Sequence, residues 1–166
     1  MAAFSTGAAL LAAVAPAAAD KRSSDQDRQR LVAAAHALEQ APLRATLADE
    51  REWALAWLAE APDITVTVCA NKLAPIVKAK YKFGGEIIVQ DMLAMGAFAI
   101  EHPEAASDPA AQQIAGLDGA LNAYSSILRD DPAAKAKALQ GLLDMRSRGE
   151  LGAFVRKAWS RCAPKK

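Results

Sequence analysis

The stretch EIIVQDMLAMGAFAIEH, residues 86–102, decides the fold of this chain. Drawn as an α-helix, it is apolar over most of its circumference, and the carboxylates of Glu86 and Asp91 interrupt that surface. A helix that is apolar on nearly all faces belongs in the interior of a bundle. The sequence therefore predicts a central helix that other helices surround.

Helical spacing of apolar residues recurs on both sides of this stretch. Residues 25–40, 114–128, 139–143 and 151–162 carry apolar side chains three or four positions apart. Turns marked by Pro or Gly, among them YKFGG at 81–85, separate these segments. We count six or seven helices and predict an all-α fold, a compact bundle built from helical hairpins.

The expected helix starts rest on capping residues. We expect Thr46 to cap a helix that runs to residue 61, and Asp63 and Asp131 to cap later helices. Ser147 and Glu150 have the spacing of a capping box for the last helix.

The segment ITVTVC, residues 64–69, fits two structures. Its alternation of apolar and polar residues is typical of a strand, but a single strand would have no obvious partner in this chain. In a longer window, apolar residues repeat at spacings of three and four. We therefore predict a helix with an irregular first turn and a bend near Pro75.

The N-terminus has the pattern of an export signal. Residues 1–19 carry no charged side chain, and a short apolar run is followed by small residues before Asp20. The run is too short to span a bilayer and fits a signal peptide cleaved after Ala19, although no Lys or Arg precedes it. The alternative is an Ala-rich N-terminal helix of a cytosolic protein. We expect a polar segment at 20–24, one domain at 25–162, a tail at 163–166 and a periplasmic or extracellular location.

Composition and charge exclude several classes of protein. The chain has 166 residues, of which 52% are hydrophobic, and its formal net charge is +1. It is too apolar and too nearly neutral to be intrinsically disordered. Neutrality also gives no general drive toward nucleic acid, and we expect no membrane span in the mature chain.

Cys69 and Cys162 are the only cysteines of the chain. In an oxidising compartment a single pair of cysteines usually forms a disulfide, which here would fasten the last helix to the middle of the chain. Two buried thiols or a redox pair are the alternatives, but redox motifs place two cysteines close in sequence. We predict the disulfide Cys69–Cys162.

No catalytic or metal-binding motif emerges from the residues. His36 and His102 are the only histidines, too few for a typical histidine metal site, and we predict neither a metal nor a cofactor. Asp91 in the apolar central stretch is expected to pair with a lysine such as Lys78 or Lys80. An enzyme would have to use Asp91, Glu86 or His102.

Two sets of residues are candidates for binding a partner. Lys78, Lys80 and Lys82 lie close to Tyr81, and together they form a candidate surface for an anionic partner. Trp53, Trp57 and Trp159 form a candidate groove for a ligand, although Trp at helical spacing is more often part of a core.

Several segments of the chain resemble a group of small exported bacterial proteins of unassigned function. The resemblance rests on the cysteine before the lysine-rich segment, on YKFGGEI at 81–87, on AFAIEHP at 97–103 and on ALNAYSSIL at 120–128. It covers residues 25–162 and implies export and an all-helical domain, and it carries over no functional residue.

Two functions follow as hypotheses. The first is an exported, non-enzymatic helical domain that binds a protein partner or a small ligand. The second is a small periplasmic enzyme whose site uses Asp91, Glu86 or His102 in a pocket of the bundle. They differ in a structural expectation, because only the enzyme needs those side chains to converge.

Overall fold

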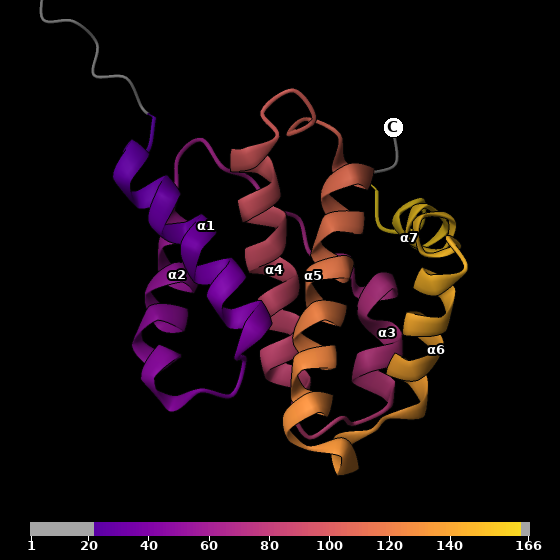
Figure 1. The fold of residues 1–166 in the computed structure, drawn as a ribbon. Helices are drawn as coiled ribbons and strands as arrows, with labels where there is room; N and C mark the ends of the chain where they lie inside the picture. The colour runs from indigo at the N-terminus through magenta and orange to yellow at the C-terminus, as the bar shows by residue number, and fades with distance from the viewer. Residues whose placement is uncertain (1–21, 164–166) are drawn as a thin grey trace, which may run out of the picture.

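The computed structural model describes residues 22–163, which form seven α-helices, two short 3₁₀ helices and no strand (Figure 1). This confirms the all-α prediction, while the predicted signal peptide lies outside the described residues. The elements in chain order are α1 (Asp25–Gln40), η1 (Ala45–Leu47), α2 (Ala48–Glu60), α3 (Ala70–Lys78), α4 (Gly84–Glu101), α5 (Pro109–Asp130), η2 (Pro132–Ala134), α6 (Lys137–Ser147) and α7 (Leu151–Trp159).

The central helix predicted from the sequence is α4. It packs most extensively against α5, and it lies between α5 on one side and α1 and α2 on the other (Figure 1). The hydrophobic core has two parts, and α4 contributes to both. Ile87 belongs to the part shared with α3, α5, α6 and α7, whereas Leu93 and Ala97 belong to the part shared with α1 and α2. The apolar circumference of α4 follows from these two contacts, since both of its sides are covered.

The contact between α4 and α5 depends on a glycine. A Cβ atom added at Gly116 of α5 would lie 2.6 Å from Met95 Cγ and 2.7 Å from the backbone oxygen of Asp91. Real Cβ atoms do not approach their neighbours so closely, so a side chain at position 116 would push the two helices apart.

The helix predicted to begin at residue 64 was wrong over its first six residues. Residues 64–69 form neither helix nor strand, and α3 begins only at Ala70. Ile64 and Cys69 are buried, but Val68 is exposed like Thr65 and Thr67, so the alternation in sequence does not continue as alternation in burial. The side-chain amide of Gln113 on α5 donates a hydrogen bond to the Thr67 carbonyl. In a helix this carbonyl would instead accept from a backbone N–H group.

Most of the predicted caps were also wrong. Thr46 lies inside η1, and no side chain caps α2. Ser147 donates to the Asp144 carbonyl within α6, so the capping box with Glu150 does not form. Asp63 accepts hydrogen bonds from Arg28 and Ser23 instead of capping α3.

Asp131 does cap a helix, the 3₁₀ helix η2, through a hydrogen bond from Ala133 N–H. Asp108, which the sequence analysis did not single out, caps α5 by accepting from two backbone N–H groups.

The predicted disulfide is confirmed. Cys69, just before α3, is bonded to Cys162, just after α7, and their Cα atoms are 5.6 Å apart. The bond therefore joins two elements that are 93 residues apart in sequence. Among residues 22–163, no helix combines the length and apolar character needed to cross a membrane.

Candidate functional site

The main candidate site is a cavity of about 870 Å³ between α3, η2, α6 and α7. Four elements build it: α3 with the turn that follows, η2, α6 from Lys137 to Met145, and α7 through Phe154. Its apolar lining consists of Pro75, Ala79, Ala133, Ala134, Ala136, Ala138, Leu142, Met145 and Phe154. We call it the lysine-rimmed pocket, because four lysines also line it.

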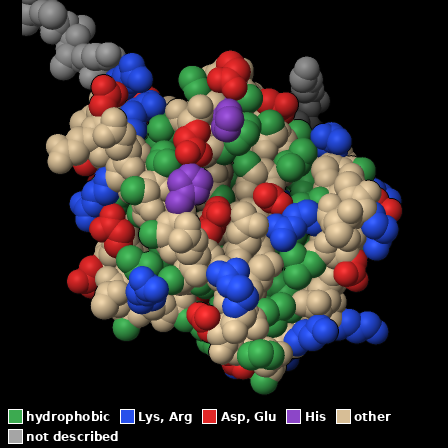
Figure 2. Space-filling view, in the orientation of Figure 1, with side chains coloured by type: hydrophobic (Ala, Val, Ile, Leu, Met, Phe, Trp, Pro, Cys, Tyr) green, Lys and Arg blue, Asp and Glu red, His purple; other side chains and the backbone are tan. Residues whose placement is uncertain are grey.

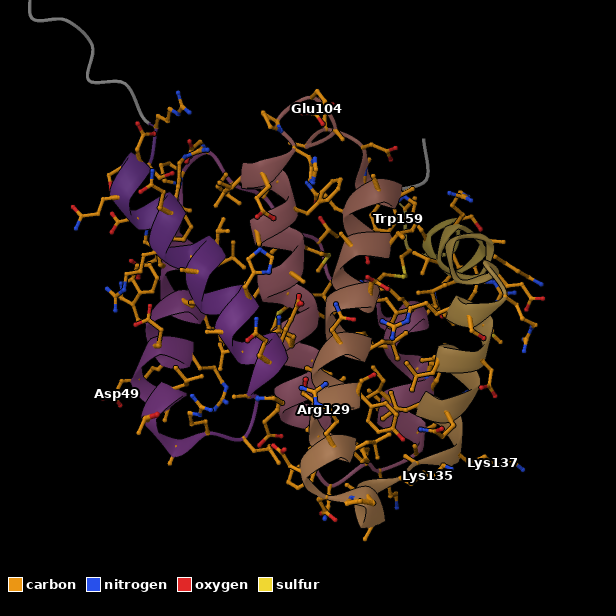
Figure 3. The ribbon with its side chains drawn as sticks, viewed as in Figure 1. Asp49, Glu104, Arg129, Lys135, Lys137 and Trp159 are labelled. Carbon is orange, nitrogen blue, oxygen red and sulfur yellow. A yellow bond between two sulfur atoms is a disulfide. The ribbon has the colours of Figure 1, made fainter. Side chains whose placement is uncertain are left out.

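These lysines are Lys80, Lys82, Lys135 and Lys137, and no aspartate or glutamate lines the pocket. Lys82 donates to Asp131 over 2.7 Å, so its charge is already paired. Within the described part of the chain, Lys80, Lys135 and Lys137 form no ion pair within 4 Å. Lys135 and Lys137 lie near each other at the lower end of α6 (Figure 3).

Lys80 has an unusual backbone conformation. Its φ angle of 48° is in the left-handed region, which glycine adopts freely and other residues adopt at a cost of about 1–2 kcal/mol. A residue directly after a helix often takes this conformation and is then usually glycine. Strained backbone of this kind is concentrated at functional sites, which makes Lys80 notable.

Lys137 also occupies a position that disfavours it. It is the first residue of α6, whose first turn contains no acidic residue. The helix dipole is positive at this end and favours anions there, so a lysine side chain gains nothing from it. The stability of helix α6 by itself therefore does not explain why a lysine lies at this edge of the pocket.

Tyr81 is the one uncharged polar side chain of the lining. Its ring packs edge-on against Tyr124, with 5.6 Å between the ring centroids. Among the described residues its buried hydroxyl has no hydrogen-bond partner, and burial raises the pKa of Tyr81 to about 12. The phenol is therefore neutral over the physiological pH range.

The structure brings together most of the partner surface expected from the sequence. Lys80, Tyr81 and Lys82 all line the pocket, whereas Lys78 is exposed outside its lining. Sequence reasoning missed Lys135 and Lys137. The alternating AAKAK of residues 133–137, next to a predicted helix start, was the one pattern that could have indicated them.

The expected groove of three tryptophans does not form. Trp53 and Trp57 stack on α2 with ring centroids 6.1 Å apart, and the Arg30 guanidinium lies 3.6 Å from the centre of the Trp53 ring. Trp159 ends α7, on the opposite side of the molecule from α2 (Figures 1 and 3). The helices that carry the tryptophans are separated by α4 and α5, so no common groove is available.

Asp91 pairs with Lys72, not with Lys78 or Lys80 as expected. Its Oδ1 lies 2.7 Å from Lys72 Nζ, and both side chains are fully buried. Burial raises the pKa of Asp91 and lowers the pKa of Lys72, while their mutual attraction opposes both shifts. The Gln113 carbonyl accepts a further bond from Lys72, and Asp91 Oδ2 has no partner among the described residues.

The three residues of the enzymatic alternative do not converge. Asp91 is buried in its ion pair, and His102 is half-exposed beside Glu104 at the other end of α4, eleven residues and roughly 16 Å along the helix axis. Glu86 lies in the first turn of α4. None of the three lines the lysine-rimmed pocket.

Both histidines lie on the surface next to acidic side chains (Figure 2). His36 Nε2 is 3.0 Å from Glu101 Oε1, and His102 Nδ1 is 3.4 Å from Glu104 Oε1. Over residues 22–163, no three side chains of His, Cys, Asp or Glu gather in a group that could hold a metal ion.

A second, smaller cavity of about 400 Å³ lies beside the loop between α4 and α5. Its charged residues include Arg28 and Asp63, which form an ion pair at 2.6 Å. Burial opposes ionisation of Asp63, but hydrogen bonds from Arg28 and Ser23 outweigh it and lower the pKa of Asp63 to about 2. This cavity therefore offers less uncompensated charge than the lysine-rimmed pocket.

Comparison of the chain with protein-family models, with curated proteins and with solved structures found no match in any of the three.

Proposed function

We propose that this protein is an exported, non-enzymatic helical domain that binds a small ligand in the lysine-rimmed pocket. The pocket itself carries the proposal. Its volume of about 870 Å³ lies in the range of small-molecule sites, which are typically apolar with a few placed polar groups. Apolar residues from α3, η2, α6 and α7 surround it, and lysines supply nearly all of its polarity.

The export part of the proposal has two supports. Residues 1–19 have the pattern of a cleaved signal peptide, and the disulfide Cys69–Cys162 is typical of oxidising compartments. We also propose that the chain belongs to a family of small exported bacterial proteins, which agrees with both observations. The mass of the protein recovered from an exporting host should correspond to a chain that begins at Asp20.

Binding can be tested with a neutral apolar fluorophore, N-phenyl-1-naphthylamine, whose emission rises in an apolar site. We expect saturable binding with one probe per chain. The variant Ala138→Phe should weaken it, because Ala138 lines the pocket and a phenyl ring there would take up part of its volume. The matched control is Ala153→Phe, at an exposed position of α7 outside the lining. Absence of saturable binding, or equal binding by both variants, would contradict the proposal.

A further inference from the structure

We propose that the ligand of the lysine-rimmed pocket is an amphipathic anion, with an apolar body and a single acidic head group. This inference rests on the proposed function and specifies the chemical class that the pocket selects. The apolar lining favours a ligand with an apolar body, and the lysines at the rim favour a negatively charged head group.

The lining leaves little to bind a polar body. Apart from the lysines, Tyr81 is its only polar side chain, and it contains no Asn, Gln, Ser, Thr, Asp or Glu. A sugar, a nucleoside or a peptide would bury several hydroxyl or amide groups, and only the lysines and Tyr81 offer side-chain partners for them. The groups left unpaired would weaken binding. An alkyl or aryl body buries only apolar surface and avoids this loss.

The rim selects the sign of the head group. A lysine ammonium donates hydrogen bonds and accepts none, so it pairs with carboxylate or phosphate oxygens. Lys80, Lys135 and Lys137 lie around one pocket without an acidic side chain in the lining, in a chain whose net charge is only +1. The positive charge is therefore local, and a cationic ligand would be repelled.

Two of these lysines lie where stability alone would not place them. Lys80 has the left-handed backbone that favours glycine, and Lys137 begins a helix whose dipole disfavours a cation. Both positions are exposed, so neither lysine is needed to fill the core. An anion bound in the pocket would be attracted to these ammonium groups, and this attraction would offset part of the cost of placing lysines there.

Three probes with the same ten-carbon chain test the class of ligand: decanoate, decan-1-ol and decyltrimethylammonium. Affinities are measured on the disulfide-bonded protein by displacement of N-phenyl-1-naphthylamine. We expect decanoate to bind at least 10-fold more tightly than decan-1-ol, and decyltrimethylammonium to bind more weakly than either. The advantage of decanoate should shrink as salt is added.

The lysine variants separate the head group from the body. Lys80→Gly should lower the affinity for decanoate several-fold and leave that for decan-1-ol unchanged. Because glycine relieves the left-handed backbone, the melting temperature of this variant should not fall, and lost binding cannot be attributed to unfolding. Lys135→Ala should act in the same direction. Lys78→Ala is the matched control, since Lys78 lies nearby and outside the lining.

Other outcomes overturn the inference in distinguishable ways. Equal affinity for decanoate and decan-1-ol would show that the pocket does not select an anionic ligand, while the proposed binding of an apolar ligand would stand. Binding to vesicles of anionic phosphatidylglycerol without binding to monomeric decanoate would indicate a membrane surface as the partner, and preference for an acidic peptide would indicate a protein. If none of the probes binds, N-phenyl-1-naphthylamine included, the proposed function itself fails.

Discussion

At the scale of single residues, Lys72 and Asp91 are distinctive, because theirs is the one ion pair among residues 22–163 that is fully buried. Both side chains are fully buried, and their charged atoms are 2.7 Å apart. Removing two charges from water costs several kcal/mol for each, and the attraction between them in the interior offsets that cost only in part. The pair is therefore sensitive to loss of either partner, because the remaining charge would be left buried and alone.

The variant Asp91→Ala should lower the free energy of unfolding by about 3–5 kcal/mol, since it isolates the Lys72 ammonium in the core. The double variant Lys72→Met, Asp91→Leu should recover most of that loss, because two apolar side chains of similar volume need no counter-charge. Urea denaturation of the three proteins checks both expectations. A double variant as unstable as the single one would show that the pair contributes more than mutual neutralisation.

Glu39, a half-buried residue near the end of α1, links protonation to stability. Burial raises the pKa of this carboxyl, although hydrogen bonds from Asn122 and Gln90 act against the shift. The folded state therefore holds its proton to higher pH than the unfolded state does. Stability should fall as pH rises from about 4.5 through the folded pKa, since ionisation is then harder in the folded protein.

The variant Glu39→Gln should remove this part of the pH dependence. Glutamine keeps a carbonyl oxygen for the Asn122 amide, loses the weaker bond from Gln90, whose amide also donates to the Ala35 carbonyl, and carries no charge. The variant should therefore be more stable than the wild type at neutral pH. His36 and Asp118 also act on Glu39, with opposite signs, and both remain in the variant. Denaturation midpoints between pH 4 and 8 provide the measurement, with the exposed Glu52→Gln as control. An unchanged slope in Glu39→Gln would contradict the assignment.

At the scale of secondary-structure elements, the contact between α4 and α5 organises the bundle. The helices were predictable because the chain carries long apolar patterns there, and α5 spans 22 residues with a clear stripe. Their close approach at Gly116 was not predictable, because a glycine in a helical pattern is compatible with many neighbours. Only the contact with Met95 and the Asp91 backbone reveals its role.

The variant Gly116→Ala should lower the free energy of unfolding by about 1–3 kcal/mol, because its methyl group would overlap atoms of α4. Gly141→Ala on α6 is the matched control, since nothing lies within 4 Å of an added Cβ there. It should raise stability by about 0.5–1 kcal/mol through helix propensity alone. Opposite signs for the two glycines in thermal denaturation are the expected result, and equal signs would contradict the close contact.

At the scale of the whole molecule, the disulfide joins the elements that surround the lysine-rimmed pocket. Cys69 precedes α3 and Cys162 follows α7, and both helices contribute residues to the pocket lining. The bond therefore adds a covalent link between two walls that pack against each other but are 93 positions apart in sequence.

The double variant Cys69→Ser, Cys162→Ser should lose up to about 4–5 kcal/mol of stability, because the unfolded chain regains the freedom of a long loop. Its affinity for N-phenyl-1-naphthylamine should also fall, since Phe154 on α7 is no longer fastened against α3. Reductant should produce both effects in the wild type and neither in the variant. A stable, fully binding reduced protein would show that packing alone positions α7.

The amino-acid sequence by itself determined the helical class, the central position of α4 and the pairing of the two cysteines. The helical class and the central position of α4 follow from the local periodicity of apolar residues. The cysteine pairing follows because two cysteines allow only one intramolecular disulfide. It also placed Lys80, Tyr81 and Lys82 on one candidate surface, because they are neighbours in the chain.

Only the tertiary structure decided which distant residues complete that surface and which never meet. Lys135 and Lys137 join Lys80 because α6 packs against α3, whereas Trp159 is kept from Trp53 and Trp57 by α4 and α5. The choice of Lys72 as the partner of Asp91 likewise depends on the packing of α3 against α4. Contacts of this kind arise from the three-dimensional arrangement of helices, which sequence periodicity does not specify.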